Sequence, residues 1–265
     1  MTATERAARA LLDWWDDAGV DAASARALAA PAQGSPARPP PQAPPPVAAP
    51  KRAPVGPIDA ARALSAQAQD LKSLAAAISA FEGCTLKNGA KNTVVHDGIE
   101  HAAVLIIGEA PGQDEDLAGK PFVGRAGQLL DRMLAGVGLS RKSNALISNC
   151  VFWRPPANRT PTPDELALCR PFVDRLIALT QPKLVLLVGG VAGQSLLNRT
   201  EGVTRLRGQR LRLAVDGLTT PVHAMVMLHP AYLLRQPAQK RLAWADLLAL
   251  EAWADELAAP RDPRV

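Results

Sequence analysis

Carboxylates gather in a glycine-rich turn that directly follows an apolar run of the sequence. Residues 103–107 read AVLII, and the turn GEAPGQDED places Glu109 immediately after the first glycine. Asp114, Glu115 and Asp116 follow in the same turn. A carboxylate at this position can activate a water molecule or stabilise a developing positive charge. An acidic cluster can also bind a hard metal ion, and a solvated turn is a further interpretation for Asp114.

An aromatic residue lies in a second glycine turn a few residues later. This turn, at residues 119–124, reads GKPFVG and contains Phe122. A ring between two turns and close to several acids is typical of a site rather than of packing. Neither G-x-G-x-x-G nor G-x-x-x-x-G-K-[ST] occurs here, and such dense carboxylates would repel a bound pyrophosphate. The pattern therefore argues against a nucleotide loop.

A second polar segment, at residues 149–159, reads NCVFWRPPANR. Asn149 follows another apolar run, and its amide offers both a donor and an acceptor, which suits the edge of an imide or amide. An asparagine that caps a turn would look the same. Arg154 and Arg159 flank rigid prolines and could reach phosphate groups.

A third segment, LHPAYLLR at residues 228–235, places His229 after an apolar run and before a proline. A lone histidine of this kind is most often a core or surface residue with ordinary partners. The segment continues with Tyr232, Leu233, Leu234 and Arg235, large side chains on an expected loop. Apolar side chains inserted into a DNA stack have this composition, and so does a loop folded back onto the core.

Alternating strand and helix patterns must position these segments. Continuous apolar strands separated by helical patterns predict an α/β fold, a three-layer α/β/α sandwich around a central, mostly parallel, four-stranded sheet. The carboxyl ends of such strands meet at one edge, where ligands bind. Helices are expected at 59–81, 126–137, 163–179, 191–197 and 239–257. Strands are expected near 93–95 and at 103–107, 145–151, 183–188, 210–215 and 222–227.

Composition divides the 265 residues into three parts. Residues 1–30 contain a short helical pattern, 31–57 form a Pro/Ala-rich arm expected to be a disordered linker, and 58–265 form the folded domain. The net charge of +5 favours a polyanionic partner only weakly. Three widely spaced cysteines fit a reducing cytoplasm. No secretory signal or membrane-spanning run is expected.

The three polar segments together resemble the uracil-DNA glycosylase superfamily, most closely its family-four enzymes of bacteria and archaea. The matching stretches are GEAPGQDED with GKPFVGRAGQLLD, then SNCVFWRPPANRTPTPDEL, then LHPAYLLR. The resemblance implies that Glu109, with Glu115 as a second acid, and His229 are catalytic, His229 bonding uracil O2. It further implies a uracil pocket formed by Ala110, Gly112, Phe122 and Asn149. It also implies a DNA-contacting surface formed by Arg154, Arg159, Tyr232, Leu233, Leu234 and Arg235.

The resemblance implies a monofunctional enzyme of base excision repair. It would flip uracil out of DNA, hydrolyse the N-glycosidic bond and leave an abasic site, with uracil-containing DNA as substrate and abasic DNA as product. We expect a monomer in the cytoplasm, associated with the nucleoid and not with a membrane. The loop RPPANRTPT lacks the histidine of a related branch that traps its substrate covalently. The alternative is a non-catalytic DNA-binding module on the same fold.

The cysteines depart from the family pattern. Family-four enzymes usually hold a [4Fe–4S] cluster through a C-x-x-C pair and two further cysteines sixteen positions apart. Here Cys84 and Cys169 are retained, whereas Phe81 and Trp153 occupy the other two positions. Cys150 is displaced by three residues from the expected ligand position. Because such a cluster needs four thiolates, we expect no metal and no cofactor, although zinc bound by the two cysteines and a histidine stays open.

Overall fold

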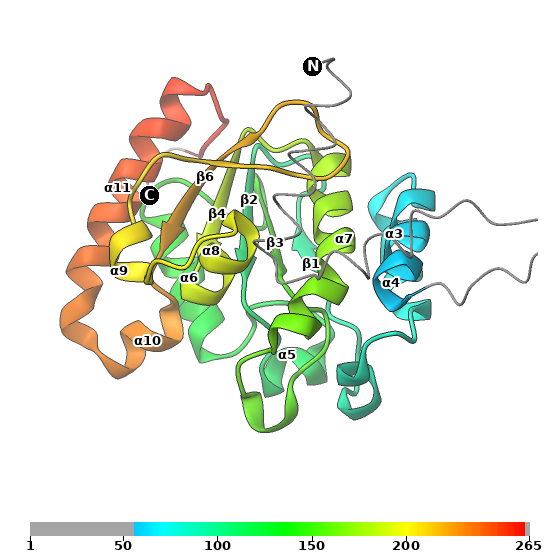
Figure 1. Cartoon of the computed structure of the whole chain (residues 1–265). Helices are drawn as coiled ribbons and strands as arrows, with labels where there is room; N and C mark the ends of the chain where they lie inside the picture. The colour runs from blue at the N-terminus through cyan, green and yellow to red at the C-terminus, as the bar shows by residue number, and fades with distance from the viewer. Residues whose placement is uncertain (1–55, 263–265) are drawn as a thin grey trace, which may run out of the picture. The chain divides into compact units, whose positions relative to one another are not determined.

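The computed structural model describes residues 56–262, and their core is one mixed sheet. The sheet has six strands in the order β1-β3-β2-β4-β6-β5 (Figure 1). The α/β prediction is confirmed, but the number of strands is six instead of four. The four inner strands are parallel, as expected, and a short antiparallel strand is added at each edge. The strands are β1 (His96–Gly98), β2 (Val104–Gly108), β3 (Ala145–Asn149), β4 (Leu184–Val188), β5 (Leu211–Leu213) and β6 (Val222–Met227).

Both faces of the sheet are covered, which explains why its inner strands are mostly apolar. In β2, Leu105 and Ile107 belong to one buried cluster, and Val104 and Ile106 belong to another on the opposite face. This alternation follows from the two-residue period of a strand. Figure 1 shows α3, α4 and α7 beside one face of the sheet and α11 beside the other. The three-layer arrangement is therefore confirmed.

The longer helices were expected, with shifts of a few residues at their ends, whereas the short helices Gln113–Ala118, which carries the acids of the expected turn, and Val203–Leu206 were not. They are α3 (Pro57–Gln67), α4 (Leu71–Ala80), α5 (Gln113–Ala118), α6 (Arg125–Ala135), α7 (Pro163–Thr180), α8 (Gly190–Leu197), α9 (Val203–Leu206), α10 (Pro230–Arg235) and α11 (Lys240–Glu256). Short 3-10 turns are η1 (Thr85–Gly89), η2 (Pro156–Asn158) and η3 (Pro237–Gln239). Among these described helices, none is long and apolar enough to cross a bilayer.

Three local predictions were wrong. The helix expected over 59–81 is two helices, because Asp70 and Ser73 form a reciprocal cap that starts α4 anew. The strand expected near 93–95 lies three residues later, as β1, where pairing with β3 begins at His96. The loop expected after β6 contains helix α10, which His229 caps at its N-terminus. The predicted N-terminal helix and most of the 31–57 linker lie outside the described residues.

Candidate active site

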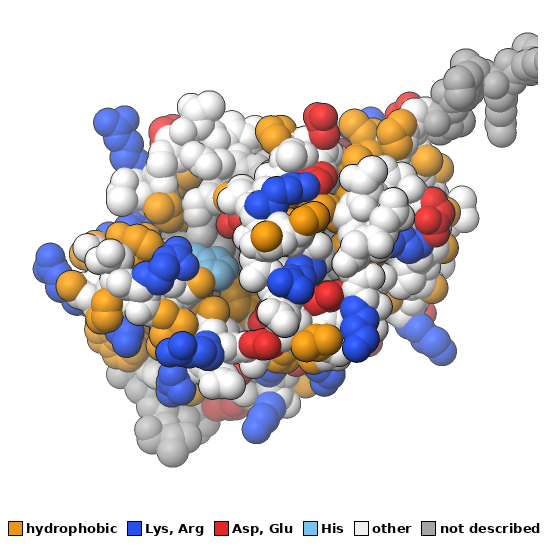
Figure 2. Space-filling view, turned by 90° about the horizontal axis from the view of Figure 1, so that it is seen from below, with side chains coloured by type: hydrophobic (Ala, Val, Ile, Leu, Met, Phe, Trp, Pro, Cys, Tyr) orange, Lys and Arg blue, Asp and Glu red, His pale blue; other side chains and the backbone are white. Residues whose placement is uncertain are grey.

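A cavity of about 440 Å³ opens at the sheet edge where β2 and β6 end, and it gathers most of the predicted site residues. Figure 2 views the end of the molecule that carries α5 and α10, where Lys and Arg side chains surround a hollow containing a histidine. Residues from all three polar segments line the cavity, namely Glu109, Ala110, Gly112, Glu115, Phe122, Arg159, His229, Tyr232 and Arg235. Three segments far apart in the sequence therefore form one site.

Glu109 enters this cavity directly from the end of β2. Burial raises the pKa of its carboxyl group, and a hydrogen bond with the Thr160 side chain acts in the opposite direction. Thr160 lies in the proline-rich loop and also lines the cavity. Nothing in the sequence separates this threonine from other loop threonines, so its contact with Glu109 was not expected. The carboxylate is thus half-buried yet held by a neutral donor, which suits the stabilisation of a cation or a water molecule.

Glu115 joins the two glycine turns to each other. Its carboxylate accepts hydrogen bonds from the backbone amides of Gly112 at 3.0 Å, Val123 at 2.9 Å and Gly124 at 2.9 Å. The Gly112 amide is therefore engaged by Glu115, although we expected it to help hold a base. A carboxylate with three such partners fixes the shape of the wall that carries Glu109 and Phe122.

Phe122 forms another wall of the cavity and has an unusual backbone conformation, with φ at 54°. Its ring lies 5.7 Å from the His229 ring, centroid to centroid, with 31° between the planes. At Gly108, an added Cβ would lie 2.4 Å from the Phe122 ring and 2.6 Å from the Asn149 side-chain oxygen. Phe122 and Asn149 therefore meet over Gly108, and only glycine leaves room for this approach.

Asn149 has an environment that is costly without a ligand. The residue is 1% exposed, yet neither its amide nitrogen nor its amide oxygen has a hydrogen-bond partner among the described residues. Buried polar atoms are nearly always paired, and an unpaired one costs about 1–3 kcal/mol. A donor and an acceptor are therefore left open side by side next to Phe122, although Asn149 itself does not line the cavity.

His229 is neutral, and one of its two ring nitrogens is bonded to the backbone. Its Nδ1 accepts a hydrogen bond from the Ala231 amide at 3.2 Å, so the neutral ring carries its proton on Nε2. Burial, with a smaller contribution from the charge of Arg235, lowers the pKa of His229 to about 4. Gly189, at φ 101°, lies so close that an added Cβ would be 3.2 Å from the imidazole. The ring is therefore a fixed neutral donor.

The residues expected to contact DNA differ in their exposure and in their hydrogen-bond partners. Arg235 and the 37%-exposed Tyr232 lie at the mouth of the cavity. Arg159 pairs through its two terminal nitrogens, Nη1 and Nη2, with the Glu165 carboxylate, and Arg154 donates to the Asn158 side chain at 2.7 Å. Leu233 is fully buried and Leu234 packs against the same core cluster. Leu233 therefore fills the core in this conformation and does not project outward.

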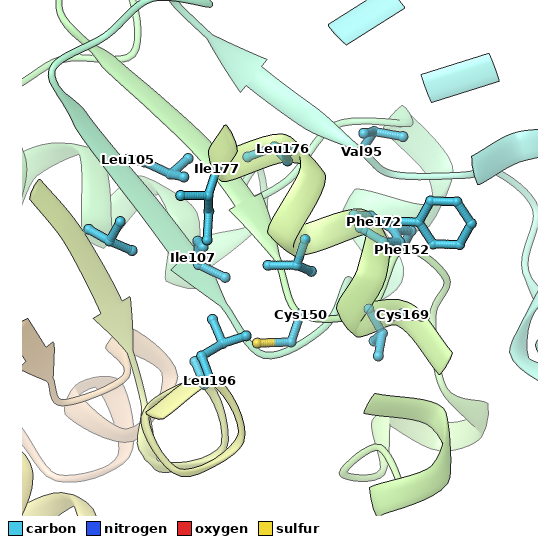
Figure 3. Close-up of a cluster of buried hydrophobic side chains, with 14 of the residues drawn as sticks. Val95, Leu105, Ile107, Cys150, Phe152, Cys169, Phe172, Leu176, Ile177 and Leu196 are labelled. Carbon is cyan, nitrogen blue, oxygen red and sulfur yellow. The ribbon is translucent and has the colours of Figure 1, made fainter. Parts of the chain in front are cut away.

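Two of the four ligand positions of the family cluster hold aromatic rings that fill the space themselves. Phe81 packs edge-on against Phe172 at 5.3 Å, and its ring lies 2.3 Å from where a Cβ on Gly83 would be. Trp153 is 1% exposed and donates through Nε1 to Thr93 at 3.1 Å. Cys150 points toward Leu196 (Figure 3). Because Phe81 and Trp153 stand at two of the four ligand positions, the residues present there cannot supply the four thiolates that such a cluster needs.

A three-layer α/β fold with a polar cavity at the carboxyl ends of its strands is typical of open-sheet enzymes. The family model of the uracil DNA glycosylase superfamily matches residues 95–248. The Type-4 uracil-DNA glycosylase of Pyrobaculum aerophilum is 36% identical over 173 residues, which are 64% of this chain and 87% of that protein. The Archaeoglobus fulgidus enzyme of the same name is 35% identical over 173 residues, covering 64% and 85%. That of Thermotoga maritima is 36% identical over 153 residues, covering 57% and 77%.

The chain therefore belongs to the uracil DNA glycosylase superfamily. It is a hydrolase of the DNA glycosylase class, and its place is in base excision repair. The resemblance inferred from the three polar segments is confirmed at the level of the family.

Proposed function

We propose that the chain is a monofunctional uracil-DNA glycosylase. It flips uracil out of DNA, hydrolyses the N-glycosidic bond, and releases free uracil and an abasic site. The observation that carries this proposal is the unpaired amide of Asn149, buried beside Phe122. Uracil presents an adjacent carbonyl acceptor and N–H donor on one edge, which would satisfy both amide atoms. Cytosine presents a different pattern at that edge and would leave them mismatched.

The charges of the site suit the cleavage step. Breaking the glycosidic bond builds positive charge on the sugar and negative charge on the uracil. Glu109 stabilises the sugar cation or orients the water that attacks it, and Nε2–H of His229 donates to uracil O2. The hydrogen bond from the neutral His229 ring to uracil O2 strengthens as O2 becomes negative, and the histidine needs no change of protonation for this. Glu115 supports this constellation through the turns that it joins.

The surroundings of the cavity support a DNA partner. Arg235 at the mouth and Arg154 in the proline-rich loop would contact phosphates on either side of the flipped nucleotide. Tyr232, partly exposed beside Arg235, is the best-placed side chain to occupy the gap in the base stack. We propose that the protein acts as a monomer, because a single chain brings Glu109, Phe122 and His229 to one cavity.

We further propose that the enzyme works without an iron–sulfur cluster. Phe81 and Trp153 occupy the positions of two cluster ligands and pack in the core there. The loop that carries Arg154 and Thr160 would then be positioned by packing and by the Arg159–Glu165 pair.

Release of free uracil from a uracil-containing oligonucleotide tests the proposal. The wild-type protein should release uracil and leave an alkali-labile site, and Glu109→Gln should release it at a rate lower by about 10²–10³-fold. If the wild-type protein binds the DNA but releases no uracil, the result would favour the alternative, a non-catalytic DNA-binding module. Equal release by the variant would move the catalytic role away from Glu109. Covalent, denaturation-resistant adducts with DNA would contradict the hydrolytic mechanism.

A further inference from the structure

We infer that Arg141 is a positioning residue for base recognition, because it holds the turn that aims Phe122 into the cavity. Arg141 lies between α6 and β3 and does not line the cavity. The inference rests on the proposed function, in which Phe122 stacks on the flipped base.

The guanidinium of Arg141 bonds two consecutive carbonyl groups of the Phe122 turn. Nη1 donates to the Pro121 oxygen at 2.8 Å, and Nη2 donates to the Phe122 oxygen at 2.7 Å. The side chain is only 12% exposed. Arg141 therefore binds the two peptide groups that flank the Cα of Phe122.

Two carboxylates orient the guanidinium itself. Asp97, in β1, accepts from Nη1 at 3.1 Å, and Asp131, in α6, accepts from Nε at 3.0 Å. Asp97 also pairs with Lys120 of the same glycine turn at 3.1 Å. Because a guanidinium is planar and presents its donors in a fixed fork, contacts to four groups leave it little freedom. A lysine ammonium, which is a point charge, could not make all of these bonds.

Phe122 needs such support because residues other than glycine rarely adopt its backbone conformation. Its φ is 54°, and its carbonyl group lies so close to the start of α6 that a Cβ on Gly127 would be 1.9 Å from the oxygen. The Phe122 carbonyl is bonded to Arg141, whereas its ring lies against Gly108 and His229. Rotation of this peptide would swing the ring away from the base.

The test compares Arg141→Lys with Arg170→Lys, a matched control at a partly buried arginine that does not line the cavity. Arg170 is 21% exposed, pairs with Asp174 and bonds the carbonyl groups of Leu196 and Ala214. Both variants should lose thermal stability. Only Arg141→Lys should slow single-turnover uracil release, by up to about 10²-fold, because a misplacement of about 1 Å can have that effect. Its affinity for uracil-containing DNA should stay within about threefold, because Arg141 reaches no phosphate in the proposed complex.

A second comparison shows whether Arg141 acts through Phe122. Phe122→Ala should weaken the binding of free uracil by about tenfold through lost stacking, as measured by calorimetry. In the Phe122→Ala background, Arg141→Lys should change neither uracil binding nor the cleavage rate further. Additive effects of the two substitutions would overturn the inference, and so would a folded Arg141→Lys protein with wild-type rate. If Arg141→Lys does not fold, Asp97→Asn replaces it, and an unchanged rate in that variant overturns the inference.

The proposed function fails on a different result. A wild-type protein that neither releases nor binds uracil would remove both the function and this role for Arg141. An active wild type with an unaffected Arg141→Lys variant would remove only the role of Arg141.

Discussion

At the scale of single residues, the side chains of the cavity are oriented by contacts from other segments of the chain: Thr160 bonds the Glu109 carboxyl group, and Arg141 bonds the turn that carries Phe122. Glu109, Phe122 and His229 could be located because each follows a strand or a glycine turn, and the structure brings them to one cavity. The roles of Thr160 and Arg141 depend on a side chain reaching another segment of the chain. No local pattern of residues encodes such a contact, so these two were missed.

The unpaired amide of Asn149 predicts opposite effects of one substitution on stability and activity. Asn149→Leu should raise the free energy of unfolding or leave it unchanged, because two unpaired polar atoms, each costing about 1–3 kcal/mol, are removed. The same change should lower kcat/KM for uracil release by at least about 10²-fold. Urea denaturation and a uracil-release assay measure the two effects.

Asn144 provides the control because its buried amide is fully used. It accepts from the Ser140 amide at 2.8 Å and donates to the Gly138 carbonyl at 3.0 Å. Asn144→Leu should therefore destabilise the protein, by about 1–3 kcal/mol for each partner left unpaired. If Asn149→Leu destabilised as strongly as Asn144→Leu, the Asn149 amide would have protein partners after all.

The pH dependence of cleavage should report Glu109 rather than His229. Glu109 must be ionised to act, and burial raises its pKa, so the rate should fall as the pH drops through a value above that of an ordinary glutamate. The His229 pKa is lowered to about 4, so no ionisation should be seen near pH 6.5. Thr160→Val removes a bond that favours the charged carboxylate and should shift the acidic limb to higher pH.

Thr160→Ser, which keeps the hydroxyl group, should leave that limb in place. Single-turnover rates between pH 4 and 9 separate these cases. An acidic limb that is the same in the wild type and in Thr160→Val would mean that the hydroxyl does not act on Glu109.

At the scale of elements, periodicity located the strands and most helices, whereas short-range capping decided the exceptions. The Asp70–Ser73 cap divides one expected helix into two, and α10 is too short for a helical period to be recognised. The edge strands β1 and β5 have three residues each, so their pairing depends on neighbours supplied by the fold. Residues 136–144, which connect α6 to β3 and are called the Arg141 segment below, are likewise held by a distant part of the chain. Arg261 and Asp262 donate hydrogen bonds to the carbonyl groups of Val137 and Gly138.

Substitution of Gly138, which lies in the Arg141 segment, tests how much the contact with residues 261–262 contributes to the free energy of unfolding. Its φ is 71°, and an added Cβ would lie 2.4 Å from the Asp262 carbonyl oxygen, beside the 2.8 Å bond from the Asp262 amide. Gly217 also has a positive φ, 88°, but nothing lies within 4 Å of an added Cβ. Gly217→Ala should cost about 1–2 kcal/mol of unfolding free energy from its backbone alone.

Gly138→Ala should cost clearly more than this, because the Asp262 contact is displaced as well. It should also slow uracil release, since the Arg141 segment loses support. Thermal denaturation of both variants gives the comparison. Equal losses of stability would show that the 261–262 contact contributes nothing measurable.

At the scale of the whole molecule, the family could be recognised from three short segments, yet its usual cofactor could not be carried over with them. Cys84 and Cys169 lie side by side in the core, where hydrogen bonding between the two thiols lowers the pKa of Cys84 and raises that of Cys169. Two thiols are half of a cluster set. The sequence indicated which ligands were replaced, and the structure adds that the replacing rings are buried and packed.

Iron analysis of the purified protein tests this replacement. We expect no stoichiometric iron or sulfide, and a chelator should leave both the melting temperature and uracil release unchanged. Phe81→Ala and Trp153→Ala should each cost about 3–5 kcal/mol, because they empty the space that the rings now fill. Ile106→Ala, which empties a fully buried position on the opposite face of the sheet, is the packing control, with an expected loss of about 2–5 kcal/mol. Bound iron near four atoms per chain, or a melting temperature that falls with chelator, would contradict a domain stabilised by aromatic packing in place of a cluster.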